Sequence, residues 1–235
     1  MQLRCNHCGW EKDVALKATP VRAMYKCHLC RRPITSVSAF RWAEWIEAYA
    51  DRLKRDRQSG RVGSRKQSVR ESDRDISCAG LGAELAACVI VSPWHVRDWM
   101  ERAESNEGNR GCDFPAAWFA NGRAAEVKFT GIANGHLLVR PPRNTPGHMM
   151  TKYIDDSIYI LMTGQPYTFH AVGWAGRSDL LKRGRLNPLP IKGKQRECWG
   201  IHADQLNPMD SVFDVLYRKR TRHEASSLNS SSLRT

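Results

Sequence analysis

The sequence from Asp113 to Thr130, DFPAAWFANGRAAEVKFT, contains the clearest prediction of local structure in this chain. Two strand-like runs, 114–120 and 123–130, flank the dipeptide Asn121-Gly122. Asn-Gly suits the two central positions of a tight turn between antiparallel strands, because both residues tolerate a positive φ. The stretch therefore predicts a β-hairpin in the middle of the chain.

The predicted hairpin also arranges three charged side chains. Side chains two residues apart on a strand share a face, so Glu126 and Lys128 point the same way and Val127 turns towards the core. Counting pairs back from the turn puts Asp113 on that same side, about 13 Å along the ladder from the partner of Glu126 at about 3.3 Å per residue. Two carboxylates at that separation cannot share one ion. We therefore expect a bulge or bend near Pro115, which cannot donate to the ladder.

Helical and strand-like segments alternate around this hairpin. Apolar residues between Leu81 and Val89 predict a buried helix, and Ser92-Pro93 predicts the start of another helix that runs to Glu104. Further strands are predicted at 137–140, 157–162 and 167–174, and a short helix at 178–182 that ends at Gly184. This order predicts an α/β fold.

Four cysteines near the N-terminus have the spacing of a metal site. They form two Cys-x-x-Cys pairs, Cys5 with Cys8 and Cys27 with Cys30. A two-residue gap lets a tight turn aim both thiolates at one face of a tetrahedral ion, and the two pairs together match a four-cysteine zinc ribbon. Two disulfides are the alternative. Because no apolar signal-peptide stretch follows Met1, we expect reduced thiols and bound Zn²⁺.

Composition divides the chain into four parts. Residues 1–34 are the predicted ribbon, which has too few apolar residues to fold without its metal. Residues 35–77 contain an amphipathic helix at about 38–55 and a basic linker at 54–77. Residues 78–217 form the predicted α/β domain, and residues 218–235, basic and then serine-rich, predict a disordered tail.

The net charge indicates the class of partner. The 235 residues carry a formal charge of +13, which favours a polyanionic partner, nucleic acid first. An anionic membrane surface could attract such a chain, but no apolar run of about 18 residues is present, and we expect a cytoplasmic protein without a membrane partner. The predicted ribbon is surrounded by Lys and Arg, which suits nucleic-acid docking or contact with a partner protein.

The α/β segment resembles the PD-(D/E)xK, or restriction-endonuclease-like, nuclease superfamily over roughly residues 76–205. The family's pattern is a helical Glu, an Asp at a strand start and Glu-x-Lys on the next strand. The matching positions are Glu84 in Gly80-Leu81-Gly82-Ala83-Glu84, Asp113 in Asn109-Arg110-Gly111-Cys112-Asp113, and Glu126-Val127-Lys128. Cys112 stands where the family has proline. The resemblance implies a mixed central sheet flanked by helices, preceded here by a zinc ribbon and a helix.

The resemblance also implies a metal-dependent endonuclease acting on DNA. Asp113, Glu126 and the backbone carbonyl of Val127 would bind Mg²⁺ or Mn²⁺, because hard divalent ions take oxygen ligands. Lys128 would hold the attacking water and offset charge on the phosphoryl oxygens, and Glu84 would assist or hold a second ion. A duplex cutter often acts as a homodimer.

Other interpretations of the same residues remain open. Glu-x-Lys on an exposed strand is usually a charge pair without a catalytic role. A non-catalytic nucleic-acid-binding regulator, in which the ribbon binds and the α/β domain is a scaffold, is the principal alternative. An adaptor that recruits a protein through the ribbon is another. Four further cysteines are expected to be core residues rather than nucleophiles, because no His and acid accompany them at a recognisable spacing: Cys78, Cys88, Cys112 and Cys198.

Overall fold

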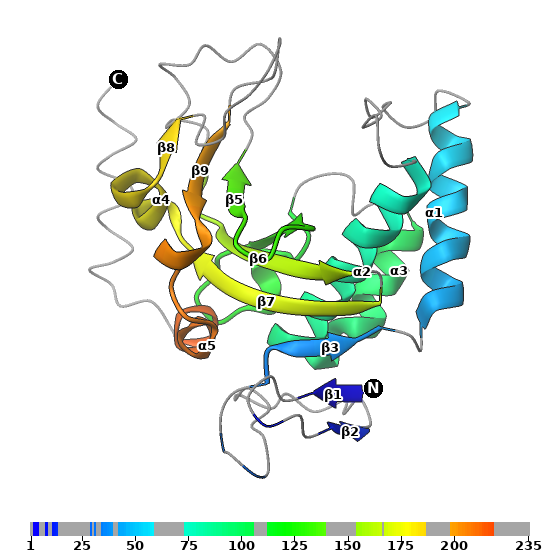
Figure 1. The fold of residues 1–235 in the computed structure, drawn as a ribbon, viewed down its shortest axis with the longest axis horizontal. Helices are drawn as coiled ribbons and strands as arrows, with labels where there is room; N and C mark the ends of the chain where they lie inside the picture. The colour runs from blue at the N-terminus through cyan, green and yellow to red at the C-terminus, as the bar shows by residue number, and fades with distance from the viewer. Residues whose placement is uncertain are drawn as a thin grey trace.

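We describe the fold from a computed structural model of the chain. The residues whose structure is described are 2–4, 8, 11–13, 29, 31, 34–39, 42–58, 73–105, 112–139, 154–165, 167–186 and 198–218. Within them, helices and strands combine into an α/β fold with a mixed sheet, as expected (Figure 1).

The central sheet has six strands in the order β2-β1-β3-β7-β6-β4. Their bounds are β1 Gln2–Arg4, β2 Glu11–Asp13, β3 Ser36–Ser38, β4 Ala125–Thr130, β6 Ile158–Gln165 and β7 Thr168–Ala175. Only the pairing of β4 with β6 is parallel, and the other pairings described are antiparallel. Strand β4 therefore lies at one end of the sheet, with an open edge along its outer side.

Strand β6 is the centre of the core. Its first six residues, Ile158 to Thr163, are all buried, which is typical of a strand covered on both faces. On one face Ile158, Ile160 and Met162 pack in the larger apolar cluster, and on the other Tyr159 and Leu161 pack in a second one. Strand β6 therefore presents apolar side chains on both faces of the sheet, and both faces have to be covered by other elements.

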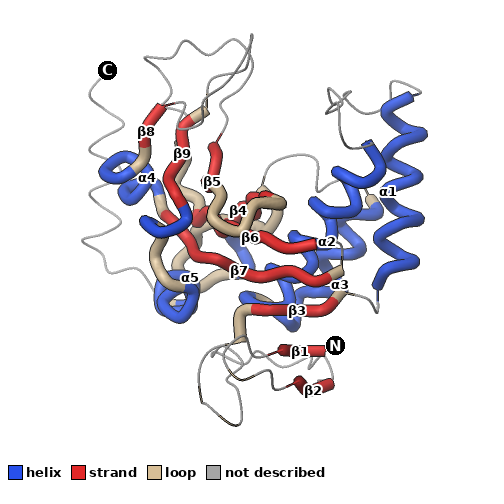
Figure 2. Tube along the Cα trace, in the orientation of Figure 1, coloured by secondary structure: helices blue, strands red, loops and turns tan. Residues whose placement is uncertain are grey.

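Helix α2 (Asp73–Val91) covers the first face and is followed by α3 (Val96–Glu104) (Figure 2). Small residues let α2 approach the sheet closely. At Gly82, an added Cβ would lie 2.5 Å from Cζ of Phe169, a fully buried side chain on β7. Helix α1 (Ala43–Gln58) packs on the outside of α2, so the amphipathic helix joins the α/β domain.

A three-stranded sheet, β5-β9-β8, covers the second face. It contains β5 His136–Val139, β8 Arg185–Leu186 and β9 Trp199–His202. Helix α4 (Arg177–Arg183) inserts Leu180 beside it, and the terminal helix α5 (Val212–Tyr217) packs in the larger cluster. The predicted strands at 137–140, 157–162 and 167–174 and the predicted helix at 178–182 are thereby confirmed, with shifted ends.

Two predicted boundaries are wrong. The helix expected at 38–55 begins only at Ala43, because Ser36–Ser38 forms β3 and pairs with β7. The linker expected at 54–77 is helical at both ends, since α1 continues to Gln58 and α2 begins at Asp73. The middle of that linker, the loop at 140–147 and the tail beyond Arg218 lie outside the described residues.

The predicted hairpin at 114–130 is also wrong in its first strand. Only a single bridge, Phe114 to Ala125, joins the two segments, and Ala116–Trp118 forms a 3₁₀ turn. Pro115 explains the change, because it has no N–H to continue the ladder and its fixed φ suits the start of a turn. The bend expected near Pro115 is therefore present, but it replaces the strand rather than interrupting it.

The close contact at Gly82 leads to a prediction about stability. Gly82→Ala should lower the free energy of unfolding by about 1–3 kcal/mol, because the new methyl group meets the buried Phe169 ring. Gly80→Ala, two residues earlier on α2, meets no atom within 4 Å and should raise it by about 0.5–1 kcal/mol through helix propensity. Urea unfolding followed by circular dichroism measures both, and a stabilising Gly82→Ala would contradict the packing described.

Candidate functional site

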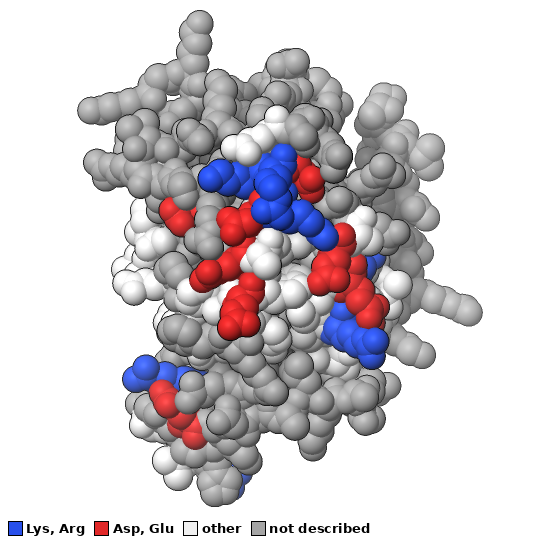
Figure 3. Space-filling model, turned by 90° about the vertical axis from the view of Figure 1, so that its right-hand side faces the viewer, with Lys and Arg blue, Asp and Glu red and all other residues white. Residues whose placement is uncertain are grey.

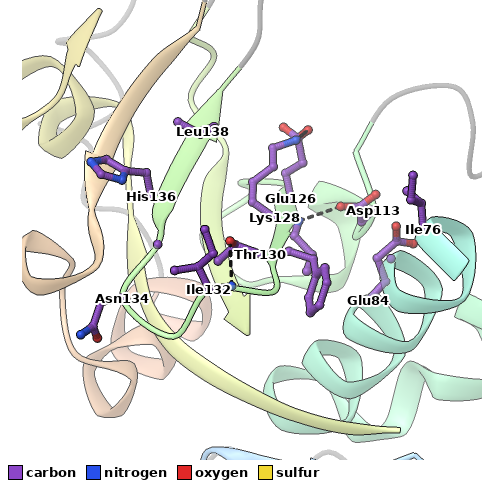
Figure 4. A pocket seen from close by; sticks show the side chains of 14 residues that line it. Ile76, Glu84, Asp113, Glu126, Lys128, Thr130, Ile132, Asn134, His136 and Leu138 are labelled. Atoms are coloured by element: carbon purple, nitrogen blue, oxygen red, sulfur yellow. Dashed lines mark hydrogen bonds and ion pairs between the residues drawn. The ribbon is translucent and has the colours of Figure 1, made fainter. Parts of the chain in front are cut away.

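A cavity of about 700 Å³ lies at the open edge of β4 (Figure 4). Three parts of the chain form its walls. Helix α2 and Asp113 form one wall, β4 forms the floor, and the turn after β4 together with β5 forms the opposite wall. The lining residues are Ile76, Gly80, Glu84, Asp113, Glu126, Val127, Lys128, Phe129, Thr130, Ile132, Asn134, Gly135, His136 and Leu138.

The four predicted catalytic side chains all line this cavity. Glu84 comes from α2, Asp113 from the segment before the Phe114 bridge, and Glu126 and Lys128 from β4. In Figure 4 the side chains of Glu84 and Asp113 extend towards the same part of the cavity. Folding therefore brings together three segments that are separated by up to about forty residues in the sequence.

Asp113 is held directly against β4. Its Oδ2 atom accepts a hydrogen bond of 2.6 Å from the backbone N–H of Val127, and the bridge from Phe114 to Ala125 aligns the two segments. The separation of about 13 Å expected from a regular hairpin is therefore wrong. The 3₁₀ turn shortens the paired part to one residue, so Asp113 meets the middle of β4 instead of its end.

The loop that returns to β4 is fixed by Asn121 and Gly122. The Asn121 side chain is buried, donates to the carbonyl of Val215 at 2.6 Å and accepts from the N–H of Arg123 at 2.9 Å. Gly122 has φ +65, a left-handed conformation that glycine adopts without strain. The predicted two-residue hairpin turn is therefore wrong: the chain does turn here, but the turn hydrogen bond runs from Gly122 N–H to the Phe119 carbonyl, and Asn121 is anchored on the segment that forms α5.

Glu126 and Lys128 share a face of β4, as their spacing predicts, and form an ion pair between Glu126 Oε1 and Lys128 Nζ. Their side chains are 28% and 27% exposed, so the pair is partly withdrawn from water. Val127 between them is buried in the core. The ionised carboxylate of Glu126 is thus balanced by Lys128, whereas that of Asp113 has no cation in direct contact among the interactions described.

Burial raises the pKa of Asp113 to about 6, above its ordinary value of 3.8. The N–H of Val127 and the charge of Lys128 lower it, and the charge of Glu126 raises it, but the loss of hydration dominates. An ionised Asp113 therefore costs free energy in the isolated protein. A bound cation, or a proton, would remove that cost.

Within the described part of the chain, no group of three or more His, Cys, Asp or Glu side chains is close enough together to hold a metal ion. In the cavity, the Glu126 carboxylate forms its ion pair with Lys128. Of the predicted zinc ligands, Cys8 lies in a turn and is exposed, and Cys5, Cys27 and Cys30 lie outside the described residues. The metal assignments for both sites remain predictions.

Several lining residues were not anticipated from the sequence. His136 and Leu138 on β5, and Thr130, Ile132 and Asn134 around the turn after β4, complete the wall opposite Asp113. Nothing in their spacing marks them, because they join the cavity only through the packing of β5 beside β4. Among the further cysteines, Cys78, Cys88 and Cys198 are buried as predicted, and Cys112, beside Asp113, is partly exposed.

The positive charge is not spread over the described surface. In the view onto the α1 side, Lys and Arg lie beside Asp and Glu rather than forming a continuous basic area (Figure 3). Among the described residues Asp and Glu slightly outnumber Lys and Arg, so the excess of +13 comes from the remaining segments. None of the helices described is long and apolar enough to cross a bilayer.

No family model matches the chain, and no match is found among the curated proteins or the solved structures. The nature of the cavity therefore has to be inferred from its side chains and their geometry.

The raised pKa of Asp113 predicts a pH-dependent effect of Asp113→Asn on stability in EDTA. Wild-type protein loses stability as the pH rises from about 4 to about 6, because the folded state must release a proton at higher pH than the unfolded state. Asparagine avoids this loss and can still accept from Val127. At pH 8 the variant should be more stable by an amount on the order of 2 kcal/mol, and at pH 4 nearly equal.

Thermal or urea unfolding at the two pH values measures this difference. Glu101→Gln, which alters a carboxylate with a 63% exposed side chain on α3, is the control and should show little change at either pH. If Asp113→Asn is less stable than wild type at pH 8, the ionised Asp113 carboxylate does not destabilise the folded state.

Proposed function

We propose that this chain is a metal-dependent phosphodiester hydrolase acting on DNA as an endonuclease. The observation that carries the proposal is the single cavity lined by Glu84, Asp113, Glu126 and Lys128. Three carboxylates and one ammonium group around a solvent-accessible space form a combination typical of divalent-ion phosphoryl chemistry. The preference for DNA over RNA depends on the resemblance to restriction-endonuclease-like nucleases alone.

The chemistry of Asp113 fits a divalent ion. Its Oδ2 is occupied by Val127 N–H, and no hydrogen bond is described for its Oδ1. The N–H and C=O of one residue in a strand point to the same side, so the Val127 carbonyl faces the same open edge as Asp113. Both are oxygen donors of the kind that Mg²⁺ and Mn²⁺ prefer. For Glu126 to act as a third ligand, its ion pair with Lys128 has to open.

The roles of the residues follow from these positions. A divalent ion held by Asp113, Glu126 and the Val127 carbonyl would supply a Lewis acid that acidifies a bound water and screens the phosphate. Lys128, once released from Glu126, can orient the water and offset charge on the phosphoryl oxygens. Glu84 faces the same space from α2 and can accept a hydrogen bond from the water or hold a second ion.

The strand register supports a role for the N-terminal cysteines as a zinc ribbon. Arg4 pairs with both Glu11 on β2 and Ser36 on β3. The chain therefore leaves β1 after Arg4 at the same end of the sheet at which it enters β3 at Ser36. Two Cys-x-x-Cys pairs can meet there around one Zn²⁺, with the ribbon docking nucleic acid or a protein partner.

The competing proposal is a non-catalytic nucleic-acid-binding regulator. The closed Glu126–Lys128 ion pair favours it, because that pair is also what an exposed strand forms without any catalytic role. Binding of DNA without cleavage in any divalent ion would support this second function.

Cleavage should be strictly dependent on a divalent ion. Purified protein is incubated with plasmid, linear duplex and branched DNA in Mg²⁺, Mn²⁺ or EDTA, and products are resolved on gels. Asp113→Asn and Lys128→Ala should each lower the cleavage rate by about 100-fold or more, because the first removes a ligand of the ion and the second removes the cation that offsets the developing charge. Glu84→Gln should lower it less.

Lys182→Gln and Glu101→Gln, on exposed positions of α4 and α3, are matched controls and should cleave like wild type. A second readout is the melting temperature, which Mn²⁺ should raise at pH 8 in wild type and not in Asp113→Asn. No cleavage of any substrate, together with no effect of Mn²⁺ on melting, would refute the enzyme.

The ribbon makes a separate prediction. Metal analysis of the purified chain should find one zinc per molecule, and Cys5→Ser with Cys8→Ser should remove it, because three or four thiolates are needed for tight tetrahedral binding. Cys78→Ser, at a buried position in α2, is the control that should retain zinc. A zinc-free wild type with intact free thiols would contradict the ribbon.

A further inference from the structure

The outward face of the β5-β9-β8 sheet carries a row of basic side chains that the catalytic proposal does not use. His136 on β5 pairs with His202 on β9, and Arg185 on β8 pairs with Gly200 on β9. Residues directly opposite each other, or two apart on one strand, share a face of a sheet. The side chains of His136, His202 and Arg185 therefore all lie on one face, which we term the basic face.

The basic face is the side of the small sheet away from the core. The alternate residues of β5, Leu137 and Val139, are buried in the second apolar cluster, whereas His136 and Leu138 are partly exposed. Arg185 is exposed, and the side chain of His202 is 37% exposed. Gly200, in the middle of β9, adds no side chain, so the face has a shallow centre between Leu138 and Arg185.

The three basic side chains are close enough to act on one another. The rings of His136 and His202 lie 4.9 Å apart in an edge-to-face arrangement. After partial burial, the charges of His202 and Arg185 are what lower the pKa of His136. Asp204 bonds only to Nδ1 of His202, at 2.5 Å, which leaves Nε2 for another partner. No described carboxylate forms an ion pair with Arg185.

The basic face is continuous with the cavity. His136 and Leu138 line the cavity opposite Asp113 as well as belonging to this face (Figure 4). A polyanion whose phosphate lies beside Lys128 would therefore pass next over His136 and towards Arg185. Repeating phosphates fit such a row, because imidazole and guanidinium N–H groups donate to phosphate oxygens.

We propose that the basic face binds the phosphate backbone of the nucleic acid next to the bond that is cut, with His136, His202 and Arg185 contacting successive phosphates. This inference rests on the proposed function, since it extends the same substrate beyond the cavity. The small sheet would then position the substrate. A substrate that ends at the scissile group should gain no binding affinity from the basic face.

The test measures binding separately from cleavage. A labelled duplex of about 20 base pairs is titrated with the zinc-loaded full chain, without added divalent ion, by fluorescence anisotropy over a range of salt concentrations. The double variant His136→Gln with Arg185→Gln should bind about 10-fold more weakly at low salt. At neutral pH the magnitude of the slope of log affinity against log salt should fall by about 1, because Arg185 neutralises one phosphate, worth about 0.9, whereas the lowered pKa of His136 leaves its imidazole an uncharged hydrogen-bond donor. Lys182→Gln on the neighbouring α4 should leave both unchanged.

Cleavage of a minimal substrate separates this inference from the proposed function. Hydrolysis of bis(p-nitrophenyl) phosphate should be unaffected by Arg185→Gln alone and lost in Asp113→Asn, because Arg185 is not among the residues that line the cavity. If wild type cuts duplex but the double variant binds it with unchanged affinity and slope, the basic face is refuted and the enzyme stands. If the double variant loses binding while no preparation cuts, the enzyme fails and the basic face stands.

Two further results would also overturn the basic face. One is a loss of binding in Lys182→Gln as large as that in the double variant, which would show that binding depends on the overall charge rather than on specific contacts. The other is variant-sensitive binding to anionic phospholipid vesicles with unchanged duplex binding. Circular dichroism checks the fold of the double variant. If the double variant does not fold, the single variant Arg185→Gln, at an exposed position, is used in its place.

Discussion

The hydrogen bond from Val127 N–H to Asp113 Oδ2 is the constraint on which the candidate site depends. It holds a carboxylate at the open edge of β4, where an unpaired backbone donor would otherwise have faced solvent. The position is costly for the ionised form, because burial raises the pKa of Asp113 to about 6. Under the proposed function, a bound divalent ion would remove this cost.

The second constraint is the close approach of α2 to the central sheet. Gly82 lies against the ring of Phe169, and the fully buried Ala83, Ala86 and Ala87 let the helix sit low on β6 and β7. Two residues beyond Gly82, Glu84 reaches the cavity from this helix. The packing of small residues therefore sets where the helical carboxylate stands relative to Asp113, and stability and site geometry depend on the same contact.

The two carboxylates on and beside β4, Glu126 and Asp113, differ in how their negative charge is balanced. Glu126 is neutralised by Lys128, and Asp113 is left to compete for a proton or a cation. Exchange between a closed ion pair and an open one would couple ion binding to the release of Lys128. On the opposite wall, His136 connects the cavity with the basic face, where Arg185 adds positive charge and His202 adds an imidazole. Glu84 and Asp113 thus line the cavity on one side of β4, and His136 lines it on the other.

The sequence by itself determined the features that depend on local chemistry. Apart from the strand expected at 114–120, the order of helices and strands from α2 to α4 and the shared face of Glu126 and Lys128 follow from periodicity of 3.6 or 2. The presence of a turn at Asn121-Gly122, though not its type, follows from the backbone preferences of Asn and Gly. The N-terminal boundaries were less accurate, because β3 pairs with β7, whose residues lie 130 to 134 positions further along the chain, such as Val37 with Phe169. Pairing at that range has no local signal.

Only the tertiary structure decided how the site is assembled. The strand expected at 114–120 could not form beyond Phe114, since the Asn121 side chain is held by Val215 and Pro115 cannot continue the ladder. That rearrangement moved Asp113 from the far end of β4 to its middle. His136 and Arg185 carry no recognisable spacing, and they meet because two separate strands flank β9. The periodicity of polar and apolar residues indicates which way a side chain faces on its own helix or strand. Distances between helices and strands are set by packing, about which a local pattern carries no information.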